Sequence, residues 1–223
     1  MGDGRLPLHP ILRDARSTSR CIERAYALDL ADRPPFGVGV AEIYRAWADA
    51  MQGEPDAAIA ELRQAIDAWV ARGEQRIAIG CYLGLLAEVE LLAGRAAEGL
   101  ATLERALAAA PEERIHLPEL LRLRGELRAA SGEEPGIVES DLREAVALAH
   151  EMGARLQELR AATSLARQLA HRDRAAEGRE LLAPLYAAFT EGFGARDLVE
   201  AKALLDELGR GQQPALVPPE GVA

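Results

Sequence analysis

The sequence predicts an all-α fold built from stacked antiparallel helix pairs. Three observations lead to this prediction. Alanine, leucine, arginine and glutamate dominate the 223 residues, and these residues carry little penalty in a helix interior. Valine, isoleucine and threonine are sparse and never alternate over a useful length, so no strand is indicated. One helix–turn–helix pattern recurs four times, as in repeat architectures.

The repeat is clearest at its turns. A glycine or aspartate followed by polar residues separates two helical segments at Gly53, Gly94, Gly132 and Asp173, with spacings of 41, 38 and 41 residues. Such residues suit a helix C-terminus where the chain enters the left-handed region. The sequence therefore predicts four units of about 40 residues, at 37–73, 74–111, 117–153 and 154–191.

Small and large residues recur at fixed positions within the units. The second helices carry a leucine at Leu62, Leu103, Leu142 and Leu182, and four residues earlier stand Ala58, Gly99, Val138 and Gly178. The first helices carry a matching small residue at Ala46, Ala87, Gly125 and Ala166. Because small residues let two backbones approach closely, we expect these positions to meet, with the leucines filling the space between adjacent pairs.

The flanking segments complete a single domain over 17–209. A helix is expected at about 17–31, before Pro34 and Pro35. A last amphipathic helix within 195–209, with an apolar stripe from Leu198 to Leu208, is expected to cap the array. Residues 1–16 are predicted to be a flexible segment, and the proline-rich tail 210–223 to be disordered.

Charge and composition narrow the classes of function. The net charge of −10, with arginines interleaved among acids, argues against a nucleic-acid partner. No uncharged apolar run approaches the 18 residues of a membrane span, so no membrane partner is expected. Cys21 and Cys81 lie far apart in helical patterns without a secretory signal. We therefore expect buried thiols in a cytoplasmic protein.

The small-residue positions resemble those of the tetratricopeptide repeat, whose units stack into a solenoid. This resemblance implies a right-handed solenoid. The sequence departs from the family pattern in its period of about 40 rather than 34 residues, in lacking a tryptophan early in the first helix, and in having Asp173 at a turn. Only Pro111 stands near the end-of-unit proline position.

Four stretches resemble a narrower group: residues 44–48, 121–127, 159–167 and 181–205. They are similar to the C-terminal repeat region of large bacterial signalling proteins that join a class III adenylate/guanylate cyclase, or a helix-turn-helix regulator, to an ATPase module. The resemblance covers about residues 20–209. It implies that the array is a sensor or partner-binding arm. Since the sequence contains no G-x-x-x-x-G-K-[ST] phosphate loop, we do not expect this chain to have the cyclase or ATPase activity of those larger proteins.

No catalytic or metal-binding pattern stands out. The four histidines (His9, His116, His150 and His171) include no i,i+4 pair, and none is near a cysteine in the sequence. A Cys–His pair could form only by long-range folding. The sequence thus predicts a chain that is not an enzyme and that needs no metal or cofactor.

The repeat register predicts which residues face the concave groove, where stacked helix pairs usually bind ligands. The set comprises Trp47, Met51, Glu88, Arg122, Glu126, Arg160 and Arg167. An aromatic, apolar end beside an arginine-rich end suits a peptide or a small acid, because guanidinium forks onto carboxylate. The alternative is structural: the arginines pair with Glu126 and other acids, and Trp47 belongs to the core.

Two functions follow from these observations. The first is a non-catalytic regulatory or protein-interaction scaffold with a protein or peptide partner. The second is a repeat domain that senses a small effector molecule. The sequence leaves the oligomeric state open.

Overall fold

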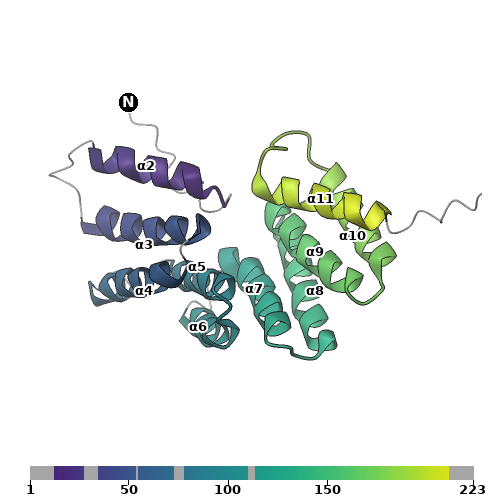
Figure 1. Ribbon diagram of the computed structural model, residues 1–223, viewed down its shortest axis with the longest axis horizontal. Coiled ribbons are helices and arrows are strands. Elements are labelled where there is room, and N and C mark those ends of the chain that lie inside the picture. Colours follow the sequence, from purple (N-terminus) through teal and green to yellow (C-terminus); the bar gives the residue numbers. More distant parts are fainter. Residues whose placement is uncertain (1–12, 28–34, 54, 73–77, 110–113, 211–223) are drawn as a thin grey trace, which may run out of the picture.

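The computed structural model describes residues 13–27, 35–53, 55–72, 78–109 and 114–210 (Figure 1). These residues form helices joined by turns, with no strand among them, which confirms the all-α prediction. In chain order the elements are α2 (Ala15–Ala27), α3 (Pro35–Met51), α4 (Pro55–Ala71), α5 (Ile79–Leu92), α6 (Ala96–Ala109), the 3₁₀ turn η1 (Arg114–His116), α7 (Leu117–Ala130), α8 (Pro135–Glu151), α9 (Arg155–Ala170), α10 (Ala175–Ala187) and α11 (Arg196–Arg210).

The helices pack consecutively, and each predicted unit contains one helix pair: α3 with α4, α5 with α6, α7 with α8, and α9 with α10. The first helices of the pairs also contact one another in order, from α3 through α5, α7 and α9 to α11. They form an inner layer, outside which α4, α6, α8 and α10 lie. The packing is compatible with a helical repeat, whereas the right-handed sense of the solenoid stays a prediction.

The turns within three of the units share one hydrogen-bonded geometry. Gly94, Gly132 and Asp173 adopt φ of 73°, 74° and 59°, in the left-handed region. The residue after each turn donates its backbone N–H to the carbonyl five positions back, for example Arg174 to Leu169 at 2.9 Å. This is the Schellman arrangement, which satisfies a carbonyl at the helix end. Asp173 takes the place of glycine because aspartate tolerates this conformation.

The small positions meet as predicted in the second and fourth pairs. A Cβ placed on Gly99 of α6 would lie 3.4 Å from the carbonyl oxygen of Ala87 in α5. A Cβ placed on Gly178 of α10 would lie 2.9 Å from the carbonyl oxygen of Ala166 in α9. The leucines differ in part from the prediction. Leu142 closes on Gly125 within its own unit as well as clustering with Leu165 of the next, because a Cβ on Gly125 would lie 2.7 Å from Leu142 Cγ.

The two flanking helices cover the ends of the described array. The cap α11 buries Leu198, Ala201, Leu204 and Leu208 in one cluster with residues of α9 and α10. Helix α2 packs on α3 and begins at Ala15, earlier than expected. Residues 13–16, predicted as part of a flexible segment, are packed: Asp14 Oδ1 accepts the backbone N–H of Ser17 at 2.9 Å, and Ala15 is buried. The predictions for 1–12, 28–31 and 211–223 lie outside the described residues.

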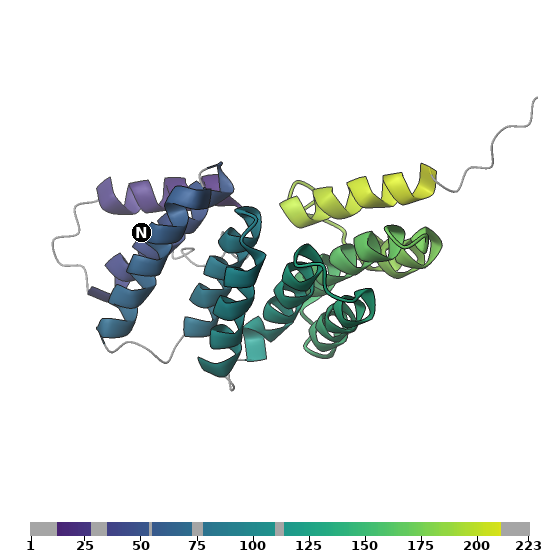
Figure 2. The same cartoon turned by 60° about the horizontal axis from the view of Figure 1, so that its bottom comes forward.

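Among the described residues, no helix combines the length and the apolar character needed to cross a membrane. In both views, α2 and α11 lie along one edge of the molecule with their N-terminal ends facing each other (Figures 1 and 2). The N-terminal ends of the first and last described helices are therefore neighbours in space.

Candidate ligand-binding site

A buried ionic cluster runs through the inner layer, and α7 supplies its centre. Glu119, Arg122 and Glu126 share one face of α7 because they are three and four residues apart. Arg122 is only 2% exposed, and its guanidinium lies 2.6 Å from Glu119 Oε1 and 2.6 Å from Glu126 Oε2. Burial alone would raise the pKa of Glu119, but the charges of Arg122 and Arg160 outweigh it and hold that pKa well below its usual range. The pKa of Glu126 is also lowered by Arg122 despite its burial, so both carboxylates are ionised at neutral pH.

Arg160 of α9 joins α7 to the cap. Its Nε and Nη2 donate to the two carboxylate oxygens of Asp197 at 2.9 and 2.7 Å, a bidentate pair. Its Nη1 also lies 3.1 Å from Glu119 Oε2. Asp197 is in the first turn of α11, where a negative charge is favoured by the helix dipole. One guanidinium thus fixes three inner-layer helices relative to one another.

Arg13, in the turn before α2, completes the cluster from the other end of the chain. Its Nη2 lies 2.7 Å from Glu88 Oε1 in α5, and its Nη1 lies 3.8 Å from Asp197 and 3.7 Å from Glu200 of α11. Its φ of 54° is an uncommon conformation for a residue other than glycine. The guanidinium of Arg13 thus lies between α5 and α11.

A pocket of about 250 Å³ opens above this cluster, and we call it the arginine pocket. Every side chain in its wall is polar or charged, which distinguishes it from an apolar cavity. The wall consists of Arg13, Arg122, Glu126, Arg160, Thr163, Ser164, Arg167, Arg196, Asp197 and Glu200.

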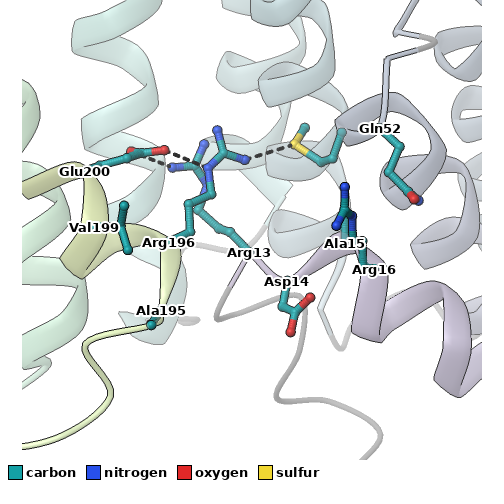
Figure 3. Close-up of a pocket in the computed structure, with 11 residues that line it drawn as sticks. Arg13, Asp14, Ala15, Arg16, Gln52, Ala195, Arg196, Val199 and Glu200 are labelled. Atoms are coloured by element: carbon teal, nitrogen blue, oxygen red, sulfur yellow. Dashed lines mark hydrogen bonds and ion pairs between the residues drawn. The ribbon is translucent and has the colours of Figure 1, made fainter. Parts of the chain in front are cut away.

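A wider cavity of about 950 Å³ adjoins the arginine pocket between the N-terminal turns of α2 and α11 and the end of α3. Figure 3 shows Arg13 and Arg196 lying together there, next to Glu200. Arg196 Nε donates to Glu200 Oε1 at 2.6 Å, and its Nη1 lies 3.9 Å from Met51 Sδ. Met51 and Val199 give this cavity apolar contacts that the arginine pocket lacks.

Four of the seven predicted groove residues come together in the wall of the arginine pocket: Arg122, Glu126, Arg160 and Arg167. Met51 lines the adjoining cavity. Trp47 does not line the groove, because it is fully buried and its Nε1 donates to Glu88 Oε2 at 3.0 Å. The structural alternative thus applies to Trp47 and to the pair of Arg122 with Glu126, but not to Arg167. The Arg167 guanidinium has no hydrogen bond or ion pair with any described residue.

The prediction missed five residues of the cluster. Glu119 had a usable signal, since it is three residues before Arg122 on the same helix. Ser164 donates to Glu126 Oε1 at 2.6 Å from α9, a contact between units that spacing within one helix does not indicate. Asp197 and Glu200 were assigned to the cap. Arg13 fell in the segment predicted to be flexible, where no periodic pattern marks it.

No protein-family model matches the chain, and no curated protein matches it. In the part of the chain that the structure describes, no three histidine, cysteine, aspartate or glutamate side chains are grouped so as to hold a metal ion. Neither Cys21 nor Cys81 forms a disulfide with a described residue, and both are partly exposed rather than buried as predicted.

Proposed function

We propose that the chain is a non-catalytic helical-repeat scaffold whose inner layer binds a partner. The observation that carries this proposal is the arginine pocket: a cluster of buried, fixed charges that opens onto a cavity and in which no described residue pairs with the Arg167 guanidinium. The resemblance to bacterial signalling proteins supports a role as their sensor or partner-binding arm.

The pKa values at the site favour binding over acid–base catalysis. Burial raises the pKa of Glu126, but Arg122 and the hydrogen bond from Ser164 lower it more, so the net shift is downward. A general acid or base works best with a pKa near the operating pH. Glu119 and Glu126 are displaced in the opposite direction, and the arginines stay protonated. These groups suit recognition of charge.

The cluster is also organised in advance of binding. Arg122 and Arg160 are each held by two acids in fixed positions. Ordering long side chains at an interface costs about 0.5–1.5 kcal/mol each, so side chains already fixed avoid this cost. The adjoining cavity supplies Met51 and the 53% exposed Val199 as apolar contacts for a peptide.

Selection from a random peptide library on the immobilised chain tests this proposal. We expect the enriched peptides to combine an apolar residue with an acidic one, and to lose binding to a Val199→Glu variant. The matched control is Ile137→Glu, because Ile137 is a similarly exposed apolar residue on α8 in the outer layer. Peptides that bind both variants as well as the parent chain would place the binding surface elsewhere.

The alternative function is sensing of a small effector. The arginine pocket has a volume of about 250 Å³, somewhat less than the roughly 300–1,000 Å³ of pockets for drug-sized ligands. This size suits a ligand of only a few non-hydrogen atoms and so favours a small effector. A peptide partner would extend over both the arginine pocket and the wider cavity, whereas a small molecule would fill the arginine pocket alone.

A further inference from the structure

We infer that the arginine pocket is a site for a small organic dicarboxylate. This inference rests on the proposed use of the inner layer as a binding surface, and it gives the effector form of that function a ligand class. Its basis is the pocket's surplus of hydrogen-bond donors.

The formal charges by themselves do not select an anion. Five arginines and three acids line the pocket. Two further acids, Glu88 and Glu119, contact these arginines from behind the wall. The count is then five against five. What remains unequal is hydrogen-bonding capacity, because each guanidinium carries five N–H donors and no acceptor.

The acceptors of the pocket are largely occupied by protein groups. Glu126 Oε1 accepts from Ser164 at 2.6 Å, and its Oε2 lies 2.6 Å from Arg122. Both oxygens of Asp197 accept from Arg160. A ligand donor therefore finds few free partners in this wall.

Several donors, by contrast, are unused. Arg167 makes no hydrogen bond or ion pair with the described residues, and Arg13 Nη1 lies 3.8 Å from Asp197 and 3.7 Å from Glu200, beyond hydrogen-bond distance. Among the described residues, the one hydrogen-bond acceptor of Arg196 Nη1 is the Met51 sulfur at 3.9 Å, and a thioether is a weak acceptor. A ligand that fits this pocket must supply acceptor oxygens.

The arrangement of the unused donors favours two carboxylates on one small molecule. Arg167 approaches from α9, while Arg13 lies in the turn before α2 and Arg196 is the first residue of α11. A planar carboxylate matches the fork of a guanidinium. A monocarboxylate would satisfy one group of donors only, and the pocket volume limits the molecule to a short acid.

Calorimetry and thermal unfolding with glutarate as the probe test the inference, at matched ionic strength and pH 7. Acetate, inorganic phosphate and a tri-glutamate peptide are the comparison ligands. We expect glutarate to bind and to raise the unfolding temperature, with acetate and phosphate at least tenfold weaker. The Arg167→Gln variant should bind glutarate about tenfold to a hundredfold more weakly, because a charged hydrogen-bonded contact is lost.

Arg179→Gln on α10 is the matched control, since Arg179 is an exposed arginine outside the pocket. It should bind glutarate like the parent chain. Because the Arg167 guanidinium pairs with no residue that the structure describes, Arg167→Gln should also fold with unchanged circular dichroism and unfolding temperature, which separates lost binding from lost structure.

Each other outcome overturns the inference. These are no binding of glutarate to the parent chain, equal binding by Arg167→Gln, and equal binding of acetate or phosphate. Binding of tri-glutamate but not of glutarate assigns the pocket to a peptide, so that the dicarboxylate inference fails while the scaffold proposal stands. Conversely, glutarate binding together with a peptide selection insensitive to Val199→Glu leaves only the effector function.

Discussion

Arg122→Met is the substitution that most directly probes the buried cluster. Methionine keeps much of the side-chain volume but removes the cation that lies 2.6 Å from both Glu119 and Glu126. Breaking a buried ion pair by removing one partner costs about 3–5 kcal/mol, since the remaining charge is left uncompensated. Glu119 keeps Arg160 at 3.1 Å, and Glu126 keeps the hydroxyl of Ser164. We therefore expect the lower end, about 3 kcal/mol.

Thermal unfolding followed by circular dichroism measures this effect. For a chain of this size, 1 kcal/mol corresponds to a shift of about 2–4 °C, so the unfolding temperature should fall by about 6–12 °C. Adding Glu126→Gln removes the uncompensated carboxylate and should restore part of the loss. The control is Arg114→Met, whose ion pair with Glu151 is exposed and worth at most about 1 kcal/mol.

The pH dependence of the variant gives an independent check on its cause. Removing Arg122 removes the largest influence that lowers the pKa of Glu126, so burial should raise its folded-state pKa relative to that of the parent chain, against the remaining hydrogen bond from Ser164. A carboxyl group with a raised folded-state pKa adds stability when protonated, and that stability is lost as pH rises. The gap between variant and parent should therefore be largest at pH 7 and narrow toward pH 4.5. A gap that is constant with pH, or a loss equal to that of Arg114→Met, refutes the explanation.

Three further predictions concern other parts of the fold. Gly178→Ala should lower the free energy of unfolding in urea by about 1–2 kcal/mol, because overpacking against Ala166 outweighs the gain in helix propensity. Gly209 has open space around it, so Gly209→Ala should raise the free energy of unfolding by about 0.5–1 kcal/mol. Equal effects of the two substitutions would contradict the close packing at Gly178. Hydrogen bonds from Arg174 and other arginines lower the pKa of Glu139 to about 2, so the stability that Glu139 contributes is present above pH 4.5 and is lost as pH falls toward 2. The unfolding temperature of Glu139→Gln should therefore fall less than that of the parent chain over this pH range. Parallel plots of unfolding temperature against pH would contradict this prediction. Arg13→Gln removes the ion pairs with Asp197 and Glu200 of α11, so we expect a larger radius of gyration in small-angle X-ray scattering. An unchanged scattering profile would show that these ion pairs are not needed to keep α2 near α11.

Local signals were sufficient to predict the repeat. Glycine or aspartate at a helix end determines the chain reversal through its own φ, and Gly53, Gly94, Gly132 and Asp173 all adopt positive φ. Likewise, the pairing of Gly178 with Ala166 depends only on helical spacing within one unit. Such features involve residues that are close in the sequence, so the spacing of these residues is enough to predict them.

The candidate site could be predicted only in part, because its geometry depends on contacts between distant elements. The helical register placed Arg122, Glu126, Arg160 and Arg167 on one surface. It could not show that Arg13 would reach Glu88 and Asp197. Nor could it show that Trp47 would donate to the buried carboxylate of Glu88 in the next unit, since both contacts join different units and depend on how these units pack.

The contact of Arg13 with α11 has a consequence for cooperativity. An array whose repeats touch only their neighbours loses structure from its ends, one repeat at a time. Arg13 and Asp197 are 184 positions apart (197 minus 13), and their approach closes the described array into a ring of contacts. Fraying of α2 would then remove a partner from α11, and fraying of α11 would remove a partner from α2. We therefore expect α2 and α11 to unfold locally together, and a ligand bound between them to stabilise both helices.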